Sequence, residues 1–352
     1  MQDYLFSAIA PMRGLTKSFF IRILRQLNTL PDVVVSEFLR VHPTSTIDHD
    51  LQILLKESQQ STYKLHIQLL GNDISSIVRT IHQLEDQYAF DGINLNFACP
   101  MPKIYRKDVG GALLRDIHHL EPILAAARET TTRTLSVKIR IGFHDDHLFS
   151  KTLELINRHH VDMLFLHART VQGRYSVPVE HSYTAQAVSQ TTCPVFANGD
   201  IQNAEQARKI QTMSSCSGVM IGRAAIRYPW IFREMAQKES STRIHSAVTF
   251  GHVLHYIMLL WEALRQQLPE VPAIHALKAF LNFVALGIDA HGQFLYRAQR
   301  ICSFQDLQQL CSYLEERSIQ IFQPTPFSGL YARPNREKPP HSNAIDGKSI
   351  HG

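Results

Sequence analysis

Short apolar runs of strand length recur along this chain at intervals of roughly thirty residues. They lie at 4–9, 33–38, 64–70, 92–97, 135–141, 161–167, 194–198 and 218–221. Amphipathic helical patterns separate most of these runs, among them 18–24, 74–88, 112–128 and 204–211. Strands that alternate with helices over about 240 residues predict a (β/α)8 TIM barrel. An open doubly wound sheet is the alternative, but residues 10–14, which follow the first strand, lack the GxGxxG motif of a dinucleotide-binding sheet.

The pattern changes after residue 243. Helical periodicity continues without intervening strands at 248–267, 273–286 and 304–319, which predicts a C-terminal all-helical domain over 244–320. Residues 321–352 contain five prolines and few large apolar side chains, so we expect a disordered or loosely attached tail there. The predicted domains are therefore 1–243, 244–320 and 321–352.

Composition is that of an ordinary soluble protein, with 44% hydrophobic and 19% charged residues in 352. No uncharged apolar run approaches the ~20 residues of a membrane span, and residues 1–4 lack the basic region of a signal peptide. The five cysteines form no CxxC, which argues against a disulfide framework or a zinc site. We therefore expect a cytoplasmic, monomeric protein that binds neither membrane nor metal. The formal charge of +5 is compatible with a polyanionic partner but too small to establish one.

Polar side chains and glycines cluster where the predicted strands end, and TIM barrels place their chemistry at those ends. In chain order they are Pro11, Met12, Arg13, Gln68, Asn96, Cys99, Lys138, Arg140, His167, Arg169, Asn198, Gly199, Asp200, Gly222 and Arg223. Lys138 and Arg140 face the same way because side chains alternate along a strand.

The last two predicted strands are each followed by a glycine-bearing turn. Backbone amides in such turns can approach an anion closely, and the corresponding loops of TIM barrels often hold a phosphate, to which Arg223 would add a charge-assisted contact. With Gln68 and Lys138 near the middle, the arrangement suits flavin mononucleotide (FMN), because an amide can recognise the ring edge and an ammonium can stabilise negative charge on the reduced ring. The structural alternative is that Gly199 closes a turn and Gly222 permits close packing.

Cys99 stands at the end of the buried run 92–97 and is followed by Pro100, which stops strand pairing. This position is one where a ligand could meet the thiol. An ordinary cysteine pKa near 8.5 leaves the group mostly protonated at neutral pH, so it can give a proton away as well as attack. Taken alone, Cys99 would more simply be a buried core cysteine.

Several motifs stand in a fixed order around these positions. From the N-terminus they are Ala10-Pro-Met12, Ser36-Glu-Phe-Leu-Arg40, Gln68-Leu-Leu-Gly71, Asn96-Phe-Ala-Cys-Pro100, Gly110-Gly-Ala-Leu-Leu114, Val137-Lys-Ile-Arg-Ile-Gly142, His167-Ala-Arg-Thr170, Asn198-Gly-Asp200 and Ile221-Gly-Arg223. With these motifs the chain resembles the bacterial tRNA-dihydrouridine synthases over residues 5–235. The helical segment and the motif that ends at Arg40 resemble the C-type subfamily, which modifies U16 in the tRNA D loop.

That resemblance implies an enzyme that binds FMN, uses NADPH and reduces a uridine of tRNA to 5,6-dihydrouridine, in the D loop at U16. The residues that would surround FMN are Pro11, Met12, Arg13, Gln68, Lys138, His167, Asn198, Gly199, Asp200, Gly222 and Arg223. Cys99 would protonate C5 of the uracil after hydride reaches C6, and Asn96 would hydrogen-bond the base. Arg40, Arg140 and Lys278 are the expected tRNA contacts, and 244–320 is the expected tRNA-binding domain.

Four positions depart from the family pattern. Ala98 replaces the glycine that usually precedes the cysteine, and Arg13 stands where an acidic or small residue is common. Asp200 is a familiar alternative to glutamate, and Phe280 occupies what looks like a tryptophan position of the C-type enzymes. The departure at Phe280 makes the assignment to U16 less secure than the activity, because the activity is inferred from the barrel motifs.

Charge in the helical segment does not by itself indicate RNA binding, because 244–320 holds five Lys or Arg and six Asp or Glu. An RNA contact there requires a local patch, such as Lys278 with Arg297 and Arg300. Barrel-rim charges at Lys103, Arg106 and Lys107 would add to it. The alternative for all of these charges is an ordinary solvated surface.

Two other functions remain open on the residues alone. A flavin barrel that reduces a free small molecule, like dihydroorotate dehydrogenase, is disfavoured by Arg40 and the helical extension. An RNA-binding or tRNA-chaperoning protein without chemistry is disfavoured by Cys99, Lys138 and Gly222-Arg223, which such a protein would not need.

Overall fold

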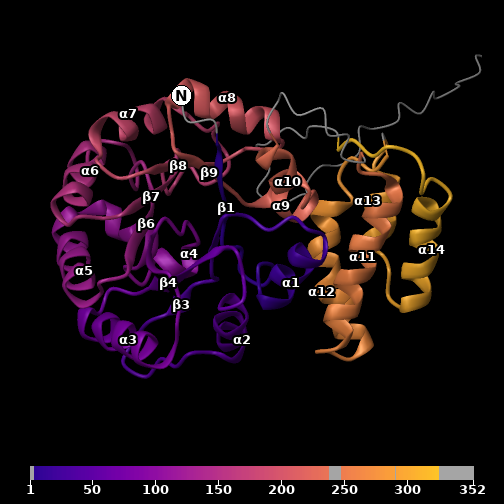
Figure 1. Ribbon diagram of the computed structural model, residues 1–352, viewed down its shortest axis with the longest axis horizontal. Helices are drawn as coiled ribbons and strands as arrows, with labels where there is room; N and C mark the ends of the chain where they lie inside the picture. The colour runs from indigo at the N-terminus through magenta and orange to yellow at the C-terminus, as the bar shows by residue number, and fades with distance from the viewer. Residues whose placement is uncertain (1–3, 238–246, 290, 325–352) are drawn as a thin grey trace, which may run out of the picture.

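The structure is a computed structural model and describes residues 4–237, 247–289 and 291–324. Within these residues eight parallel strands follow the order β2-β1-β9-β8-β7-β6-β5-β4, and pairing of β2 with β4 closes the ring. The strands of the ring are β1 (Phe6–Ile9), β2 (Val33–Val35), β4 (Lys64–Leu70), β5 (Gly92–Phe97), β6 (Thr134–Arg140), β7 (Met163–His167), β8 (Val195–Asn198) and β9 (Gly218–Ile221). Helices surround the ring (Figure 1). The predicted TIM barrel is confirmed.

Seven outer helices of the described residues cover the ring, and four of them begin at a capping side chain. The seven are α1 (Ser18–Gln26), α2 (His49–Ser58), α3 (Ile74–Gln87), α5 (Ile117–Thr130), α6 (Phe149–Arg158), α7 (Ser182–Gln190) and α8 (Ala204–Ser214). Asp48, Asp73 and Asn203 each accept a backbone N–H at the start of α2, α3 and α8. The predicted helix at 112–128 is instead divided into a 3-10 helix, η1 (Gly110–Arg115), and α5. The division falls at Asp116, whose backbone is extended and whose carboxylate caps α5.

The predicted strand at 33–38 is shorter in the structure. Strand β2 ends at Val35, and a two-residue strand, β3 (Leu39–Arg40), pairs with the end of β4. At this point Ser36 Oγ accepts the N–H of Gln68 at 3.0 Å, so a side chain takes over from the backbone ladder. The bend brings Glu37 and the ring of Phe38 to the end of the barrel where the strands finish.

The barrel interior is divided into an apolar half and a polar half. The apolar half is a cluster of Ala8, Ala10, Val33, Val35, Phe165, Phe196 and Met220. On β4, β5 and β6 the corresponding buried side chains are polar, namely His66, Gln68, Asn94, Asn96 and Ser136. A polar group removed from water needs a hydrogen-bond partner, so these side chains must satisfy one another.

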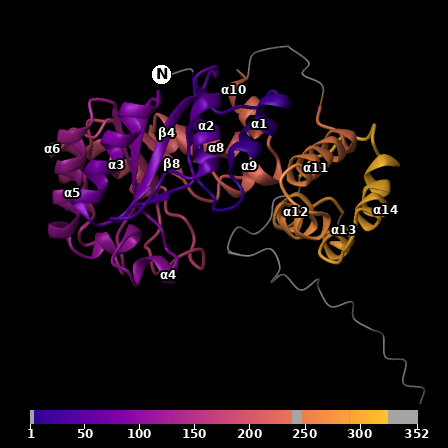
Figure 2. The same ribbon diagram turned by 90° about the horizontal axis from the view of Figure 1, so that it is seen from below.

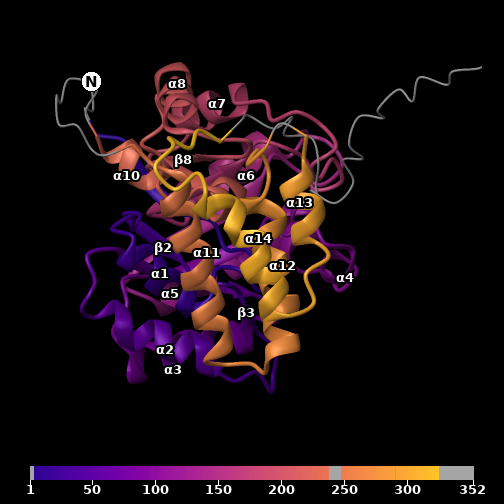
Figure 3. The same ribbon diagram turned by 90° about the vertical axis from the view of Figure 1, so that its right-hand side faces the viewer.

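A helical region follows the barrel and stands against one side of it (Figures 2 and 3). Two short helices lead into it, α9 (Arg223–Arg227) and α10 (Ile231–Ala236). Its own helices are α11 (Phe250–Arg265), α12 (Glu270–Val284), α13 (Gln293–Ala298) and α14 (Phe304–Glu315). Three of them match the predicted helical segments to within a few residues, and α13 is a short helix that the pattern did not indicate. One further helix of the described residues, α4 (Pro102–Tyr105), lies in the loop after β5.

The barrel and the helical region share one hydrophobic core. Phe280 of α12 lies against Phe19 and Phe20 of α1, with ring centroids 5.8 and 6.0 Å apart. Tyr256 of α11 donates its hydroxyl to the Ile226 carbonyl at 2.9 Å. The guanidinium of Arg227 donates from Nε and Nη2 to the Leu286 carbonyl at 3.0 and 2.8 Å. Because buried contacts cross the whole junction, the helical region is held rigidly on the barrel.

The predicted domain limits fall close to the edges of what is described. The boundary between 243 and 244 lies within 238–246, outside the described residues. At the start of the segment predicted as a tail, Ile321 pairs with Thr249 and Phe322 is 3% exposed, so these two residues are attached to the helical region. Residues 325–352 of that tail lie outside the described residues. None of the helices in the described ranges is both long and apolar enough to cross a membrane.

We expect Phe280→Ala to lower the free energy of unfolding by about 3–5 kcal/mol, because it opens a cavity at the junction of barrel and helical region. The loss should appear as one shifted transition in urea, followed by both circular dichroism and tryptophan fluorescence, since the two parts share a core. Phe280→Leu, which keeps most of the apolar volume, should cost much less. Two separated transitions, with only one of them shifted, would contradict the shared core.

Candidate active site

A cavity of about 600 Å³ opens at the carboxyl ends of the barrel strands. It collects nearly all of the residues that the sequence singled out from separate loops. Those in its lining are Pro11, Met12, Arg13, Gln68, Asn96, Cys99, Lys138, Arg140, His167, Asn198, Gly199, Asp200, Gly222 and Arg223. A hollow of this size and mixed polarity is typical of a site for a cofactor or small ligand.

The loop that carries Cys99 is fixed on two sides. Asn96 Oδ1 accepts the backbone N–H of Ala98 at 3.1 Å and that of Cys99 at 3.0 Å. From behind, the N–H of Gly111 donates to the Cys99 carbonyl at 3.3 Å. Gly110 has φ +63°, and a Cβ on it would stand 3.1 Å from Cys99 Cβ, so glycine is required where η1 meets this loop. The thiol is therefore carried by a rigid backbone.

Burial raises the pKa of the Cys99 thiol, although a hydrogen bond from the Met101 backbone and the charges of Arg140 and Lys138 act the other way. The side chain is half-buried and packs beside an apolar cluster of Leu70, Ile104 and Val109. At neutral pH the sulfur consequently holds its proton. Such a group can donate a proton to a developing carbanion.

Lys138, His167 and Asn198 form a hydrogen-bonded group on three neighbouring strands. Asn198 Oδ1 accepts from Lys138 Nζ at 3.1 Å and from His167 Nδ1 at 2.9 Å. Its orientation is set because Asn198 Nδ2 donates to the Met220 carbonyl at 2.7 Å. Burial, reinforced by the charge of Arg140, lowers the pKa of Lys138 to about 7. The amino group of Lys138 can therefore gain or lose a proton near neutral pH.

His167 is held as a neutral ring. Its burial and the cations around it lower its pKa well below the ordinary value. Arg169 Nη1 lies 3.2 Å from His167 Nε2 and can only donate, so Nε2 accepts and the proton resides on Nδ1. That tautomer agrees with the Nδ1 contact to Asn198.

Asp200 joins two arginines at the loop after β8. Its carboxylate accepts from Arg223 Nη2 at 2.7 Å and also pairs with Arg169, which is 1% exposed. Asp200 has φ +51° and Gly199 has φ +121°, so the turn is tight. A Cβ on Gly199 would lie 2.7 Å from Val179 Cγ2, which makes glycine a requirement of this turn.

Gly222 differs from Gly199. A Cβ there would meet Met12 Sδ at 3.5 Å and Ala10 Cβ at 3.6 Å, which are ordinary contacts, and its φ is not positive. Packing within the described residues thus gives no reason for a glycine at 222. The open space beside it belongs to the cavity, so the close approach of a ligand is the better explanation.

Tyr175 was not identified from the sequence. It lies half-buried on the loop after β7 and lines the cavity. Three described guanidinium groups surround its ring, those of Arg140 at 5.7 Å, Arg169 at 6.0 Å and Arg223 at 5.0 Å from the centroid. Its loop position follows no strand period, so no sequence signal pointed to it.

Other missed residues did carry a signal. His66, Asn94 and Ser136 each stand two positions before a residue that the sequence analysis identified, and side chains two apart on a strand share a face. Glu37 belongs to a quoted motif, and its carboxylate accepts the N–H groups of Gly14 at 2.9 Å and Thr16 at 3.0 Å. This carboxylate holds the loop after β1 in place.

The three expected RNA contacts lie in different surroundings. Arg140 is 2% exposed and donates to the carbonyls of Ala98 at 3.0 Å and Thr170 at 2.9 Å. It can reach a base inside the cavity but not the outer surface of an RNA. Arg40 and Lys278 are half-buried and lie outside the cavity lining that the described residues form. Arg40 Nη1 is buried without a hydrogen-bond partner in the described part of the chain, and burial lowers the pKa of this side chain.

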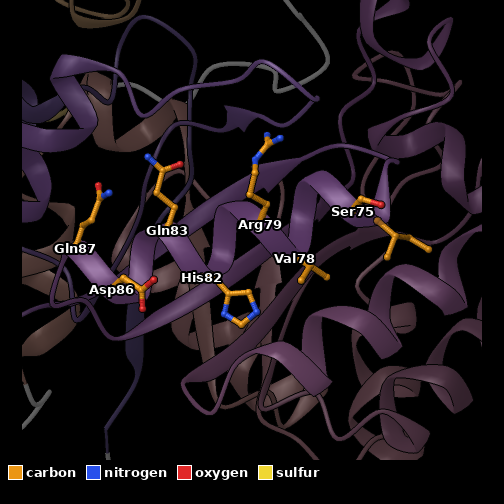
Figure 4. A pocket seen from close by; sticks show the side chains of 8 residues that line it. Ser75, Val78, Arg79, His82, Gln83, Asp86 and Gln87 are labelled. Atoms are coloured by element: carbon orange, nitrogen blue, oxygen red, sulfur yellow. The ribbon is translucent and has the colours of Figure 1, made fainter.

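A second hollow runs along the outside of α3 (Figure 4). All of its lining belongs to that one helix, and Arg79 turns its guanidinium to the carbonyls of His42 at 2.9 Å and Pro43 at 2.7 Å. It gathers no converging chemical groups and is an ordinary helix surface. Across the described residues, no three or more His, Cys, Asp or Glu side chains are arranged to hold a metal ion.

The fold and the cavity define a TIM-barrel enzyme with its chemistry at the carboxyl ends of the strands. The family model described as "Dihydrouridine synthase (Dus)" matches residues 8–312. The chain belongs to this family of flavin-dependent oxidoreductases. The match spans both the barrel and most of the helical region.

Relatives agree with this assignment. A "Probable tRNA-dihydrouridine synthase" of Helicobacter pylori is 28% identical over 251 residues, 70% of this chain and 74% of that protein. The "tRNA-dihydrouridine synthase B" of Pseudomonas aeruginosa is 31% identical over 237 residues, 64% of this chain and 68% of that protein. Among solved structures, histamine dehydrogenase from Rhizobium sp. 4-9 has a TM-score of 0.53 at 11% identity, covering 91% of this chain and 62% of that one. The last likeness concerns the fold alone.

We expect the stability of this enzyme to fall in mild acid because His66 is buried as a neutral ring. Burial lowers the pKa of His66 to about 4. An unfolded histidine titrates near 6.5, so the unfolded chain binds more protons, and the free energy of unfolding decreases as the pH drops from about 6.5 to about 4. Between pH 7.5 and pH 5 this one ring should account for a loss of about 2 kcal/mol.

The variant His66→Asn tests that expectation, because its side-chain amide can hydrogen-bond Ser136 Oγ in place of Nδ1 but does not titrate. Urea unfolding at both pH values should show a smaller loss for the variant than for the wild type. Part of the dependence should persist, since His167 is also buried and neutral. An equal loss in both proteins would show that His66 does not control acid stability.

Proposed function

We propose that this chain is a tRNA-dihydrouridine synthase that uses FMN and NADPH to reduce a uridine of the tRNA D loop, at U16, as a cytoplasmic monomer. One observation carries the proposal. A single cavity brings the protonated thiol of Cys99 together with the ammonium of Lys138 and the open space beside Gly222. The names of the relatives support tRNA as the substrate. The C subtype is proposed from the helical segment and the motif that ends at Arg40.

The residues present fit FMN. A volume of about 600 Å³ lies within the range of cofactor sites. Gly222 leaves room for a phosphate at the end of β9, and Arg223 stands beside it with its guanidinium held by Asp200. Pro11, Met12, Arg13, Gln68, Lys138, His167, Asn198 and Gly199 would complete the site. When bound, FMN supplies the two-electron reduction, with NADPH as the source of the electrons.

The chain's own groups would handle the proton and the base. Cys99 holds a proton on Sγ until negative charge develops at C5 of the uracil, and then donates it. Lys138 stabilises negative charge in the same space. Asn96 hydrogen-bonds the base from the start of the Cys99 loop, and Arg140 lies within reach of it. The rigid backbone of that loop keeps the thiol in a fixed position relative to the base.

A uridine in a folded tRNA must leave its loop to reach such a cavity, and the barrel mouth is a suitable pocket for an extruded base. Phe283 of α12 belongs to the cavity lining, so the helical region borders the entrance. We propose that this region contacts the body of the tRNA through Lys278, Arg297 and Arg300, with Arg40 closer to the entrance. Such contacts go mainly to phosphates and shape.

The test of the proposed function begins with the purified protein. FMN is identified by flavin absorbance and by chromatography of the released cofactor, and NADPH is compared with NADH as reductant. Unmodified tRNA is then supplied, and the reduced uridine is mapped in each product. Dihydrouridine at position 16 supports the whole proposal. A yellow protein that oxidises NADPH without modifying any tRNA would indicate a small-molecule reductase instead.

We expect Cys99→Ala to retain bound FMN and its reduction by NADPH, but to slow reduction of tRNA by about a hundredfold to ten-thousandfold, the usual contribution of a general acid. Stopped-flow absorbance separates the two half-reactions. Cys193→Ala removes another half-buried thiol, outside the cavity lining, and should leave both rates unchanged. Undiminished turnover on tRNA in Cys99→Ala would remove this thiol from the mechanism.

We expect Lys278→Glu to raise the KM for tRNA about tenfold and to reduce the salt dependence of binding, because one phosphate contact is replaced by repulsion. NADPH oxidation in the absence of tRNA should not change. Lys209→Glu makes the same charge change on α8 of the barrel and serves as the matched control (Figure 1). Equal effects of the two substitutions would indicate general electrostatics and no specific contact on α12.

A further inference from the structure

A continuous row of hydrogen-bonded side chains crosses the polar half of the barrel and ends at the Cys99 loop. Its members, here called the polar row, are His66, Ser136, Asn94, Gln68 and Asn96. All five are between 0% and 7% exposed. Strand register sets them side by side, with Gln68 opposite Asn94 on β4 and β5, and Asn94 opposite Ser136 on β5 and β6.

Each link of the polar row has good hydrogen-bond geometry. His66 Nδ1 lies 2.8 Å from Ser136 Oγ, and Asn94 Nδ2 donates to the same Oγ at 2.9 Å. Gln68 Nε2 donates to Asn94 Oδ1 at 2.8 Å, and Asn96 Nδ2 donates to Gln68 Oε1 at 2.8 Å. The row therefore reaches from the barrel interior to the backbone of Cys99 without a gap.

The two ends determine which way every amide points. At one end Ser136 donates its single hydroxyl proton to the Ile93 carbonyl at 3.2 Å, so its oxygen must accept from Asn94. At the other end Asn96 Oδ1 receives two backbone N–H groups, from Ala98 and Cys99. Between these anchors no amide can turn over without placing two donors or two acceptors against each other, which is costly in a buried site.

This polarity limits what Asn96 can offer a ligand. Both lone pairs of its Oδ1 are occupied, and one hydrogen of Nδ2 goes to Gln68. What remains toward the cavity, among the partners that the described residues provide, is one N–H donor. Asn96 can therefore meet a carbonyl oxygen of a pyrimidine but not its N–H or amino edge.

We propose that the polar row makes Asn96 a donor-only group for the substrate base, and that Ser136 and Asn94 are positioning residues that act through Asn96. This inference rests on the proposed function. Neither Ser136 nor Asn94 is part of the cavity lining formed by the described residues. The substrate class that follows is a pyrimidine that turns a ring carbonyl toward the end of β5.

A double-mutant cycle on the holoenzyme tests the positioning role. Ser136→Ala removes the anchor, and we expect kcat for tRNA to fall about tenfold to a hundredfold, as for a misplacement of reacting groups by about 1 Å. In an Asn96→Ala background the same substitution should cost less than twofold more, because its effect passes through Asn96. Ser136→Thr, which keeps the hydroxyl, should restore most of the rate. If Ser136→Ala does not fold, Asn94→Leu replaces it in the cycle.

Asn96→Asp tests the donor role, since the carboxylate can still accept the two loop N–H groups but has no proton to donate to a base or to Gln68 Oε1. It should lose as much kcat as Asn96→Ala. Full multiplication of the two losses in the cycle, or an active Asn96→Asp enzyme, would overturn the proposal. Val33→Ala, in the apolar half of the barrel, controls for general destabilisation and should retain kcat.

A readout without tRNA separates this inference from the proposed function. The rate of Cys99 alkylation by iodoacetamide, followed by peptide mass spectrometry, reports how firmly the loop is held. It should rise severalfold in Ser136→Ala and remain at the wild-type value in Ser136→Thr, which keeps every link of the polar row. An unchanged alkylation rate in Ser136→Ala contradicts the polar row even if tRNA is reduced. A protein that never modifies tRNA, yet shows the rise, contradicts only the proposed function.

Discussion

The arrangement of the site depends on the two hydrogen bonds that Asn96 Oδ1 accepts from the backbone of Ala98 and Cys99, because they fix the loop that carries the thiol. They turn the chain sharply at the end of β5 and carry the thiol to the edge of the cavity. The amide that makes them is itself held by Gln68, so the loop takes its position from the barrel interior. A loop supported in this way needs no flexibility to present the sulfur, and the glycines of η1 allow the chain behind it to pack closely.

Burial decides the protonation states around that loop. Removing charged groups from water favours their neutral forms, so the thiol of Cys99 keeps its proton and the rings of His66 and His167 lose theirs. The same effect brings the pKa of Lys138 to about 7. The site therefore offers a neutral acid next to a cation that can be neutralised, which is a suitable arrangement for adding a proton and two electrons to a ring.

The helical region completes the site from outside the barrel. Its core is continuous with that of the barrel through Phe280 and Tyr256, so its position relative to the cavity is constant. Phe283 reaches the cavity lining from the same helix. Membership in the dihydrouridine synthase family extends to residue 312 and so includes this region. The family assignment and the shared core both indicate that barrel and helices work as one unit.

The sequence by itself determined the barrel, the helical region and most of the cavity, because these depend on local patterns. Alternation of strands and helices is written in the periodicity of apolar residues, and the ends of parallel strands meet at one edge of a barrel whatever their side chains. Gln68, Cys99, Lys138 and Gly222 could be placed in this way. The break at Asp116 and the short β2 could not, because a single side-chain hydrogen bond decided each.

Only the tertiary structure decided how those residues are connected. Tyr175 lies on a loop, and its three guanidinium neighbours come from the end of β6, the loop after β7 and the start of α9. The donor and acceptor sense of Asn96 depends on Ser136, forty residues further along the chain and on the next strand. Such links follow from register and burial, which bring side chains of neighbouring strands within hydrogen-bond distance. A sequence pattern records which residues face inward, but the partner that each one meets is determined only when the barrel closes.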